Sequence, residues 1–216
     1  MVRATKSWIV LILIVLLSAP SCVSPQSTPG LSSPPKNSGR ALQVAELSGG
    51  SVVTNLGYGI QVNKGSSLQR RWFVINDPSC PVRLSGAGIS TVYQSSSIGG
   101  DYKYKATGQA VTTETVTAFQ VRYLLFDIWG EHARTLSDTE VSDLRGQIAL
   151  KDTGSWTTWE NDVSEIFTVV SFVARVRRPD GTIWEYDPSS MLQQVEGIKV
   201  KLTEKELTPE REKPKS

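Results

Sequence analysis

The sequence is poor in the residues on which metal binding and covalent cross-linking depend. Its 216 residues include one histidine and two cysteines, Cys22 and Cys80. Two cysteines can form at most one bridge, which excludes a disulfide scaffold. One histidine with scattered carboxylates offers no ligands at a metal-binding spacing, so we expect neither a metal ion nor any other cofactor.

The sequence also lacks an excess of charge of either sign. It has 23 Lys and Arg against 21 Asp and Glu, and Arg3 and Lys6 near the N-terminus account for the difference. The chain that follows these two residues is therefore neutral. Because phosphate binding needs clustered Lys and Arg, we expect no nucleic-acid partner.

Catalytic motifs are missing as well: there is no glycine-rich phosphate loop, no Gly-x-Ser-x-Gly elbow and no His-Glu-x-x-His. Two alternatives to an inert surface stay open, a nucleophilic pair of Cys80 and His132 and a calcium site of Asp127, Asp138 and Asp143. The competing interpretation is a half-buried cysteine, a turn histidine and aspartates that cap turns. We expect no catalytic residue, and a hydrolase with paired carboxylates is the remaining enzymatic alternative.

The N-terminal residues 1–22 have the features of an export signal. Arg3 and Lys6 precede an unbroken apolar run, Trp8–Leu17, and small residues lead from it to Cys22. The run of about ten residues is shorter than the roughly 20 that a membrane-spanning helix needs. We therefore expect a signal peptide and an exported protein.

This segment resembles a bacterial lipoprotein signal, in which small residues precede a cysteine that becomes acylated and N-terminal. Ser21 and Cys22 fit that pattern, whereas Ala19 and Pro20 are unusual in it. The resemblance implies lipidation at Cys22 and a lipoprotein anchored to a membrane of the cell envelope, each buried methylene contributing roughly 0.8 kcal/mol. The alternative is ordinary cleavage after Ser21, which gives a soluble periplasmic or secreted protein.

Composition divides the rest of the chain into three parts. Residues 23–44 are rich in Ser, Pro and Gly and predict a flexible linker. Residues 45–200 carry alternating apolar and β-branched positions and form the expected domain. Residues 201–216 mix Lys and Glu with two prolines, which predicts a charged, disordered tail.

The domain is expected to consist of short strands separated by turn residues, which is typical of an all-β antiparallel sandwich. The expected strands are 71–76, 82–93, 101–106, 116–129, 166–176 and 182–186. Gly86 and Gly88 indicate a bulge or bend within the second of them. In the strand 166–176 the expected core face contains Ile166, Val170, Phe172, Ala174 and Val176.

Three local features complete this interpretation. Arg178–Gly181 predicts a tight hairpin, because its Pro-Asp pair suits a type I turn and its glycine supplies the left-handed residue. Residues 137–144 indicate a short capped turn. Residues 188–198 indicate a short helix near the C-terminus.

Two motifs resemble the signature of the Phe-x-Leu-Tyr-Asp family of bacterial Ig-like domains. They are Tyr123–Asp127 followed by Gly130, and Asn76–Ser79 before Val82–Leu84. The aromatic positions are exchanged here and the motifs lie far apart, so the resemblance requires an insertion. It implies an Ig-like β-sandwich of the accessory kind, which carries no catalytic residues.

Trp156 and Trp159 lie three residues apart in a polar segment, Gly154–Asp162. Their rings can stack on a sugar or peptide ligand, or they can fold inward as part of the core. We expect a non-catalytic envelope lipoprotein that binds an envelope protein partner through loops or a sheet edge. A carbohydrate-binding module that uses these exposed tryptophans is the alternative.

Overall fold

The computed structural model describes residues 41–47, 63, 65, 67–96, 99–158 and 166–209, all within a compact unit of residues 37–216. At residues 90–96, 99–102, 151–155, 157 and 158 the structure describes the backbone alone. The export signal with Cys22, nearly all of the linker, and Trp159 lie outside the described residues. In the part of the chain that is described, no helix is both long and apolar enough to span a bilayer.

The described residues lie mainly in strands. The strands are β1 (Gln43–Leu47), β2 (Arg71–Asn76), β3 (Val82–Ser96), β4 (Gly99–Phe126), β5 (His132–Thr158), β6 (Thr168–Arg177) and β7 (Ile183–Glu185). They are followed by the helix α2 (Pro188–Gly197) and the 3-10 helix η1 (Glu204–Leu207). The all-β class and the short helix near the C-terminus are confirmed.

The strands form one mixed sheet. Its order is β1-β2-β6-β4-β3, with β5 paired to β4 and β7 to β6. Every described pair is antiparallel except β2 and β6, which run parallel with Arg71 opposite Thr168. The prediction of antiparallel pairing throughout is wrong at this pair. A parallel pair needs a long crossover, here the three long strands between β2 and β6, and local turn signals do not reveal it.

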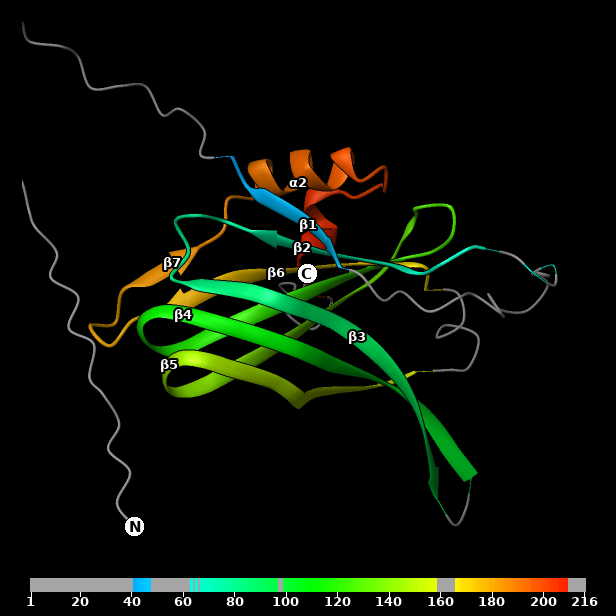
Figure 1. The fold of residues 1–216 in the computed structure, drawn as a ribbon, viewed down its shortest axis with the longest axis horizontal. Helices are drawn as coiled ribbons and strands as arrows, with labels where there is room; N and C mark the ends of the chain where they lie inside the picture. Colours follow the sequence, from blue (N-terminus) through cyan, green and yellow to red (C-terminus); the bar gives the residue numbers. More distant parts are fainter. Residues whose placement is uncertain are drawn as a thin grey trace, which may run out of the picture. The chain divides into compact units, whose positions relative to one another are not determined.

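β4 and β5 are long enough to belong to two regions of the sheet. They have 28 and 27 residues, against the usual 3–10 or so. Up to Thr112, β4 pairs with β3 and β5, and from Ala118 to Phe126 it pairs with β5 and β6. The register is irregular between these two parts, and such bulges bend and twist a strand. The sheet therefore curls, as the green strands of Figure 1 show.

Because of this curl, the central strands β2, β6 and the second part of β4 are covered on both faces. We call β3, the first part of β4 (to Thr112) and the last part of β5 (from Gly146) the β3 layer, and residues 188–207 the C-terminal layer. In Figure 1, α2 lies on one side of β2 and β6 while β3, β4 and β5 curve away on the other. A separate hydrophobic cluster fills each interface.

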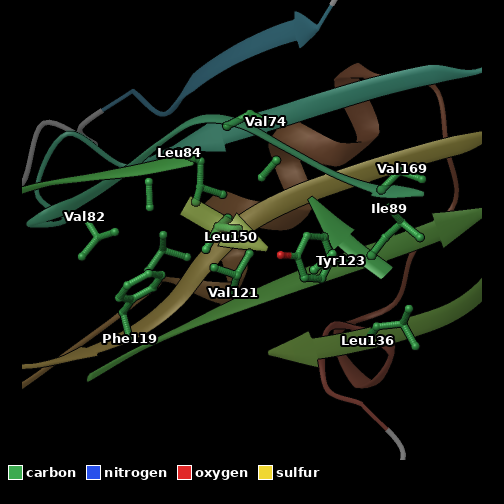
Figure 2. Close-up of a cluster of buried hydrophobic side chains, with 14 of the residues drawn as sticks. Val74, Val82, Leu84, Ile89, Phe119, Val121, Tyr123, Leu136, Leu150 and Val169 are labelled. Atoms are coloured by element: carbon green, nitrogen blue, oxygen red, sulfur yellow. The ribbon is translucent and has the colours of Figure 1, made fainter. Parts of the chain in front are cut away.

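The two clusters draw on alternate residues of the same strands. Against the β3 layer lie Val74, Phe119, Val121, Tyr123 and Val169, together with Val82, Leu84 and Ile89 (Figure 2). Against the C-terminal layer lie Phe73, Ile75, Leu124, Phe126, Val170 and Phe172, together with Met191, Val195 and Leu207.

The strand β6 shows a consequence of this double cover. Val170, Phe172 and Ala174 face the C-terminal layer as one set, but Ile166 and Val176 belong to the opposite cluster. The prediction that these five residues share one face is wrong. A strand buried on both faces has a nearly continuous apolar sequence, from which the facing of each residue cannot be read.

Two local predictions are confirmed. β6 and β7 form a hairpin through Arg178–Gly181, where the Gly181 N–H donates to the first carbonyl of the turn at 3.0 Å and Gly181 has a φ of 87°. The helix α2 starts after Asp187, whose carboxylate accepts hydrogen bonds from the N–H groups of Ser189 and Ser190.

The segment 137–144 is a strand and not the expected turn. It lies within β5 and pairs with β4, with Ser137 opposite Arg122 and Asp138 opposite Val121. Both side chains are buried. Polar residues that favour turns occupy buried strand positions here, so the sequence pattern indicates the wrong element.

The folded body extends beyond the predicted domain at both ends. β1 begins at Gln43, inside the predicted linker. Past residue 200, Thr203 and Glu206 form a capping box at the start of η1, and Leu207 is completely buried. One buried leucine in a charged segment is a weak signal in the sequence, although it closes the C-terminal layer.

Candidate functional site

An open hollow of about 440 Å³ lies where β1 and β2 meet the β3 layer. It falls within the range of about 300–1,000 Å³ that is typical of small-molecule sites. We call it the glycine hollow, because glycines of β3 and β4 form part of its lining. Its main lining residues are Leu47, Trp72, Gly86, Gly88, Thr107 and Gln109.

The aromatic wall of the hollow comes from β2. Trp72 pairs with Leu47 of β1 and packs against the same cluster as Val74, two residues further along the strand. A Cβ added at Gly88 would lie 3.9 Å from two atoms of the indole, so the ring sits directly over the β3 backbone. The half-buried indole therefore presents a rigid apolar surface at the border of the core.

The fold requires glycine at one of two positions in this region and not at the other. Gly108 has a φ of 136°, and an added Cβ would lie 1.7 Å from the Gly86 carbonyl oxygen, so the pairing of β3 with β4 requires glycine there. Gly86 has no positive φ, and an added Cβ would meet no atom within 4 Å. The fold does not require glycine at position 86, and its presence leaves the strand backbone bare toward the hollow.

Side chains from the central sheet hold β3 in place behind the hollow. The Asn76 amide donates to the Leu84 carbonyl at 2.9 Å and accepts from the Leu84 N–H at 2.8 Å. The Ser171 hydroxyl, fully buried, donates to the Ala87 carbonyl at 3.1 Å. These main-chain groups of β3 are therefore already occupied.

The chemistry that the hollow offers is that of neutral binding. Among the described residues that line it, none carries an ionisable side chain. Its polar groups are those of Ser85, Thr107 and Gln109, and the Ser85 hydroxyl donates to the Gln109 carbonyl at 3.3 Å. The Gln109 side-chain oxygen accepts from the Gln147 amide at 2.6 Å. Such a surface suits an uncharged ligand, because a charged group would be desolvated there without a partner.

The structure places Trp156, the predicted ligand contact, against the core. Its ring meets Tyr123 edge to face with the centroids 6.1 Å apart, and it is partly buried against the β3-layer cluster. Trp156 is not among the residues that line the glycine hollow. The use of Trp156 with Trp159, which lies outside the described residues, stays a prediction.

The structure does not bring Cys80 and His132 together as a nucleophilic pair. Cys80 is buried, its sulfur accepts from the Val82 N–H at 3.4 Å, and burial raises the pKa of its thiol to about 12. His132 lies instead beside Thr135, whose hydroxyl is 2.8 Å from Nε2, and 3.6 Å from a Glu206 carboxylate oxygen through Nδ1. A thiol with so high a pKa is a poor nucleophile at neutral pH.

The candidate calcium ligands have other roles in the structure. The Asp127 carboxylate accepts from the N–H groups of Trp129 and Glu131 at 2.9 Å each, which fixes the turn between β4 and β5. Asp138 is buried in β5, whereas Asp143 is exposed. Among the side chains that the structure describes, no three His, Cys, Asp or Glu residues are grouped so as to hold a metal ion.

The hollow is only partly predictable from the sequence. The sequence indicates a bend at Gly86 and Gly88, which the irregular register between Leu84 and Gly86 confirms, but it does not connect them with Trp72. No sequence pattern marks Trp129, which lies in the turn fixed by Asp127 and is 76% exposed. Glycines within a strand were the only available signal for the site.

Comparisons with known proteins return no match for this chain among family models, curated proteins or solved structures.

Proposed function

We propose that this chain is an exported, non-catalytic binding protein of the cell envelope, anchored by lipid at Cys22, which acts as an adapter through the glycine hollow. The observation that supports it most directly is an open hollow with an aromatic wall, whose described lining residues carry no ionisable side chain. Such a surface is suited to recognition, since pockets that bind ligands combine apolar walls with a few polar groups.

The anchor and the tether come from the sequence. Basic residues at the N-terminus, the apolar run that follows and Cys22 support export and acylation. The Ser/Pro-rich stretch from residue 23 provides a spacer before β1. A folded body on such a spacer reaches partners at a distance from the membrane surface. This layout is what an adapter needs.

The Ig-like sandwich belongs to the same proposal. Its support is the face-to-face packing of the β3 layer on the central strands, in which Val82 and Leu84 share a cluster with Phe119 and Val121. The parallel pairing of β2 with β6 is a departure from the antiparallel arrangement of that family.

Photo-crosslinking in cells tests the adapter role. A photoreactive amino acid replaces Gln109, which is exposed beside the hollow, and in a matched strain it replaces Gln193, exposed on α2. We expect a discrete adduct with an envelope component from position 109, absent from position 193, and lost when Gly86→Val fills the hollow. Identical adducts from both positions, or an adduct insensitive to Gly86→Val, would refute binding at the hollow.

Intact-mass spectrometry of the native protein tests the anchor. We expect a mass that begins at Cys22 and includes acyl chains, and a Cys22→Ala variant that is found in the soluble fraction. A native protein that retains Met1, or that begins at an unacylated residue, contradicts the lipoprotein assignment.

A further inference from the structure

We infer that the glycine hollow binds a neutral sugar ring, which stacks on Trp72 above the bare backbone at Gly86. The inference rests on the proposed binding role of the hollow and specifies its ligand class. It moves carbohydrate recognition from the tryptophans that the sequence suggests, Trp156 and Trp159, to a different tryptophan on β2.

The shape of the hollow supports a flat ligand. Trp72 forms one wall and the β3 backbone forms the floor, where Gly86 carries no side chain and an added Cβ would meet open space. Glycine within a strand weakens the strand, and it often marks a place where a ligand approaches the backbone. Since Gly86 is not required by its φ or by a close contact, a ligand on this floor gives it a physical reason.

The polarity of the hollow supports a ligand with two kinds of surface. The indole, Leu47 and Ile89 provide apolar contact, while Ser85, Thr107 and Gln109 provide hydroxyl and amide groups. A pyranose ring has an apolar face of C–H groups and a rim of hydroxyls, and it uses both. A purely aliphatic ligand would cover these polar groups without forming hydrogen bonds to them.

The lack of charged side chains in the described lining of the hollow disfavours anionic sugars as ligands. No ionisable side chain is present in the described lining, so the carboxylate of an acidic sugar would find no cationic partner among these residues. We therefore expect neutral hexose or N-acetylhexosamine units to bind better than their acidic counterparts.

A peptide strand is disfavoured as the occupant. Strand addition needs free main-chain groups at a sheet edge. On β3 the N–H and carbonyl of Leu84 are bonded to Asn76, and the carbonyl of Ala87 is bonded to Ser171. The edge of β3 beside the hollow is thus occupied at these positions.

Saturation-transfer NMR with the native, full-length mature protein tests the inference. The probes are a neutral trimer of N-acetylglucosamine, a neutral glucose trimer and a glucuronic acid oligomer. We expect saturation transfer from the protein to at least one neutral trimer at about 1 mM ligand, a concentration suited to dissociation constants in the millimolar range, and none to the acidic oligomer. Absence of transfer to both neutral trimers overturns the sugar assignment.

Variants place the binding at the hollow. Gly86→Val should abolish the signal with the fold intact, because the new side chain enters open space. Trp72→Phe should weaken binding about tenfold, since a smaller ring stacks less well. Trp129→Ala serves as the matched control, because it removes an exposed tryptophan away from the hollow and should leave binding unchanged. Binding that survives Gly86→Val, or that is lost in Trp129→Ala, would overturn the inference.

The failure of this inference differs from the failure of the proposed function. Loss of the position-109 adduct in Gly86→Val, together with no sugar binding, keeps the hollow as a docking site for another envelope component and rejects the sugar. No adduct and no sugar binding reject both.

Discussion

Two neighbouring residues of β4 show how differently the two faces of the central sheet are closed. Arg122 faces the C-terminal layer, where its Nη1 donates to the Tyr186 hydroxyl at 3.0 Å and to the Leu207 carbonyl at 2.9 Å. Tyr123 faces the β3 layer, completely buried, and its hydroxyl has no hydrogen-bond partner in the described structure. Figure 2 shows that hydroxyl among apolar side chains.

The comparison teaches that the C-terminal layer is held by buried polar bonds as well as by packing. The β3 layer is held by packing together with the half-buried Asn76 and the fully buried Ser171, which bond to the β3 backbone, but the hydroxyl of Tyr123 in its interior has no partner in the described structure. Removal of a buried polar group should therefore lower the stability of the protein at Arg122 and raise it at Tyr123.

The largest expected effect is the loss of the β3 layer in Gly108→Ala. The added Cβ would collide with the Gly86 carbonyl, and the φ of 136° is unfavourable for alanine. We expect destabilisation of roughly 4 kcal/mol or more, measured by urea denaturation. Gly86→Ala is the control and should change the stability by less than about 1 kcal/mol. Equal stability of both variants would contradict the close contact of β3 and β4.

The next effect concerns the C-terminal layer. Arg122→Met keeps apolar contact but leaves the buried Leu207 carbonyl without its donor, so we expect a loss of about 2–3 kcal/mol. Limited proteolysis should show earlier cleavage after residue 187 than in the wild type. Arg134→Met, on an exposed position of β5, is the control and should behave as wild type.

A smaller loss is expected when the β3 edge is released. Asn76→Ala removes both bonds to Leu84, and because Asn76 is only half-buried we expect about 1–2 kcal/mol. Asn76→Asp retains an acceptor for the Leu84 N–H but cannot donate to the Leu84 carbonyl. Its stability should therefore lie between those of the wild type and Asn76→Ala. Faster amide exchange of β3 in Asn76→Ala, with α2 unaffected, would localise the effect.

The smallest effect has the opposite sign. Tyr123→Phe removes a buried hydroxyl without a partner, so we expect a gain of about 1 kcal/mol. Burial, and then the charges of Asp138 and Glu140, raise the pKa of Tyr123 above its ordinary value of 10.0. The unfolded chain therefore loses this proton first, and stability falls as the pH rises above about 10. Denaturation at pH 8 and pH 11 should show a smaller alkaline loss in Tyr123→Phe than in wild type.

Features that depend on neighbouring residues could be predicted from the sequence. The Arg178–Gly181 hairpin and the start of α2 after Asp187 follow from turn and cap chemistry within a few positions. Alternation also located β2 and β6, although it could not say which faces of β6 were covered. Whether a face of β6 is buried depends on which segments pack against it, and the layers on both faces come from other parts of the chain.

Features that depend on distant pairing could not be predicted. The parallel pair of β2 and β6 has no turn of its own, and β5 carries buried polar residues such as Ser137 where a strand pattern calls for apolar ones. The hollow requires Trp72 to lie over Gly88 and Gly108 to pair beside Gly86. That arrangement is fixed by the register of the strands in the sheet. The order of residues along a single sequence does not reveal this register.

The parallel pairing of β2 with β6 also constrains the order in which the chain can fold. Neighbouring strands β3, β4 and β5 can pair as soon as they exist, but Arg71 meets Thr168 only after nearly the whole body is available. Pairing across so long a loop is slow, because the intervening chain loses conformational entropy before the stabilising contacts form. Until β6 is available, β2 can pair with β1 alone, and its other edge stays exposed as a template for non-native pairing.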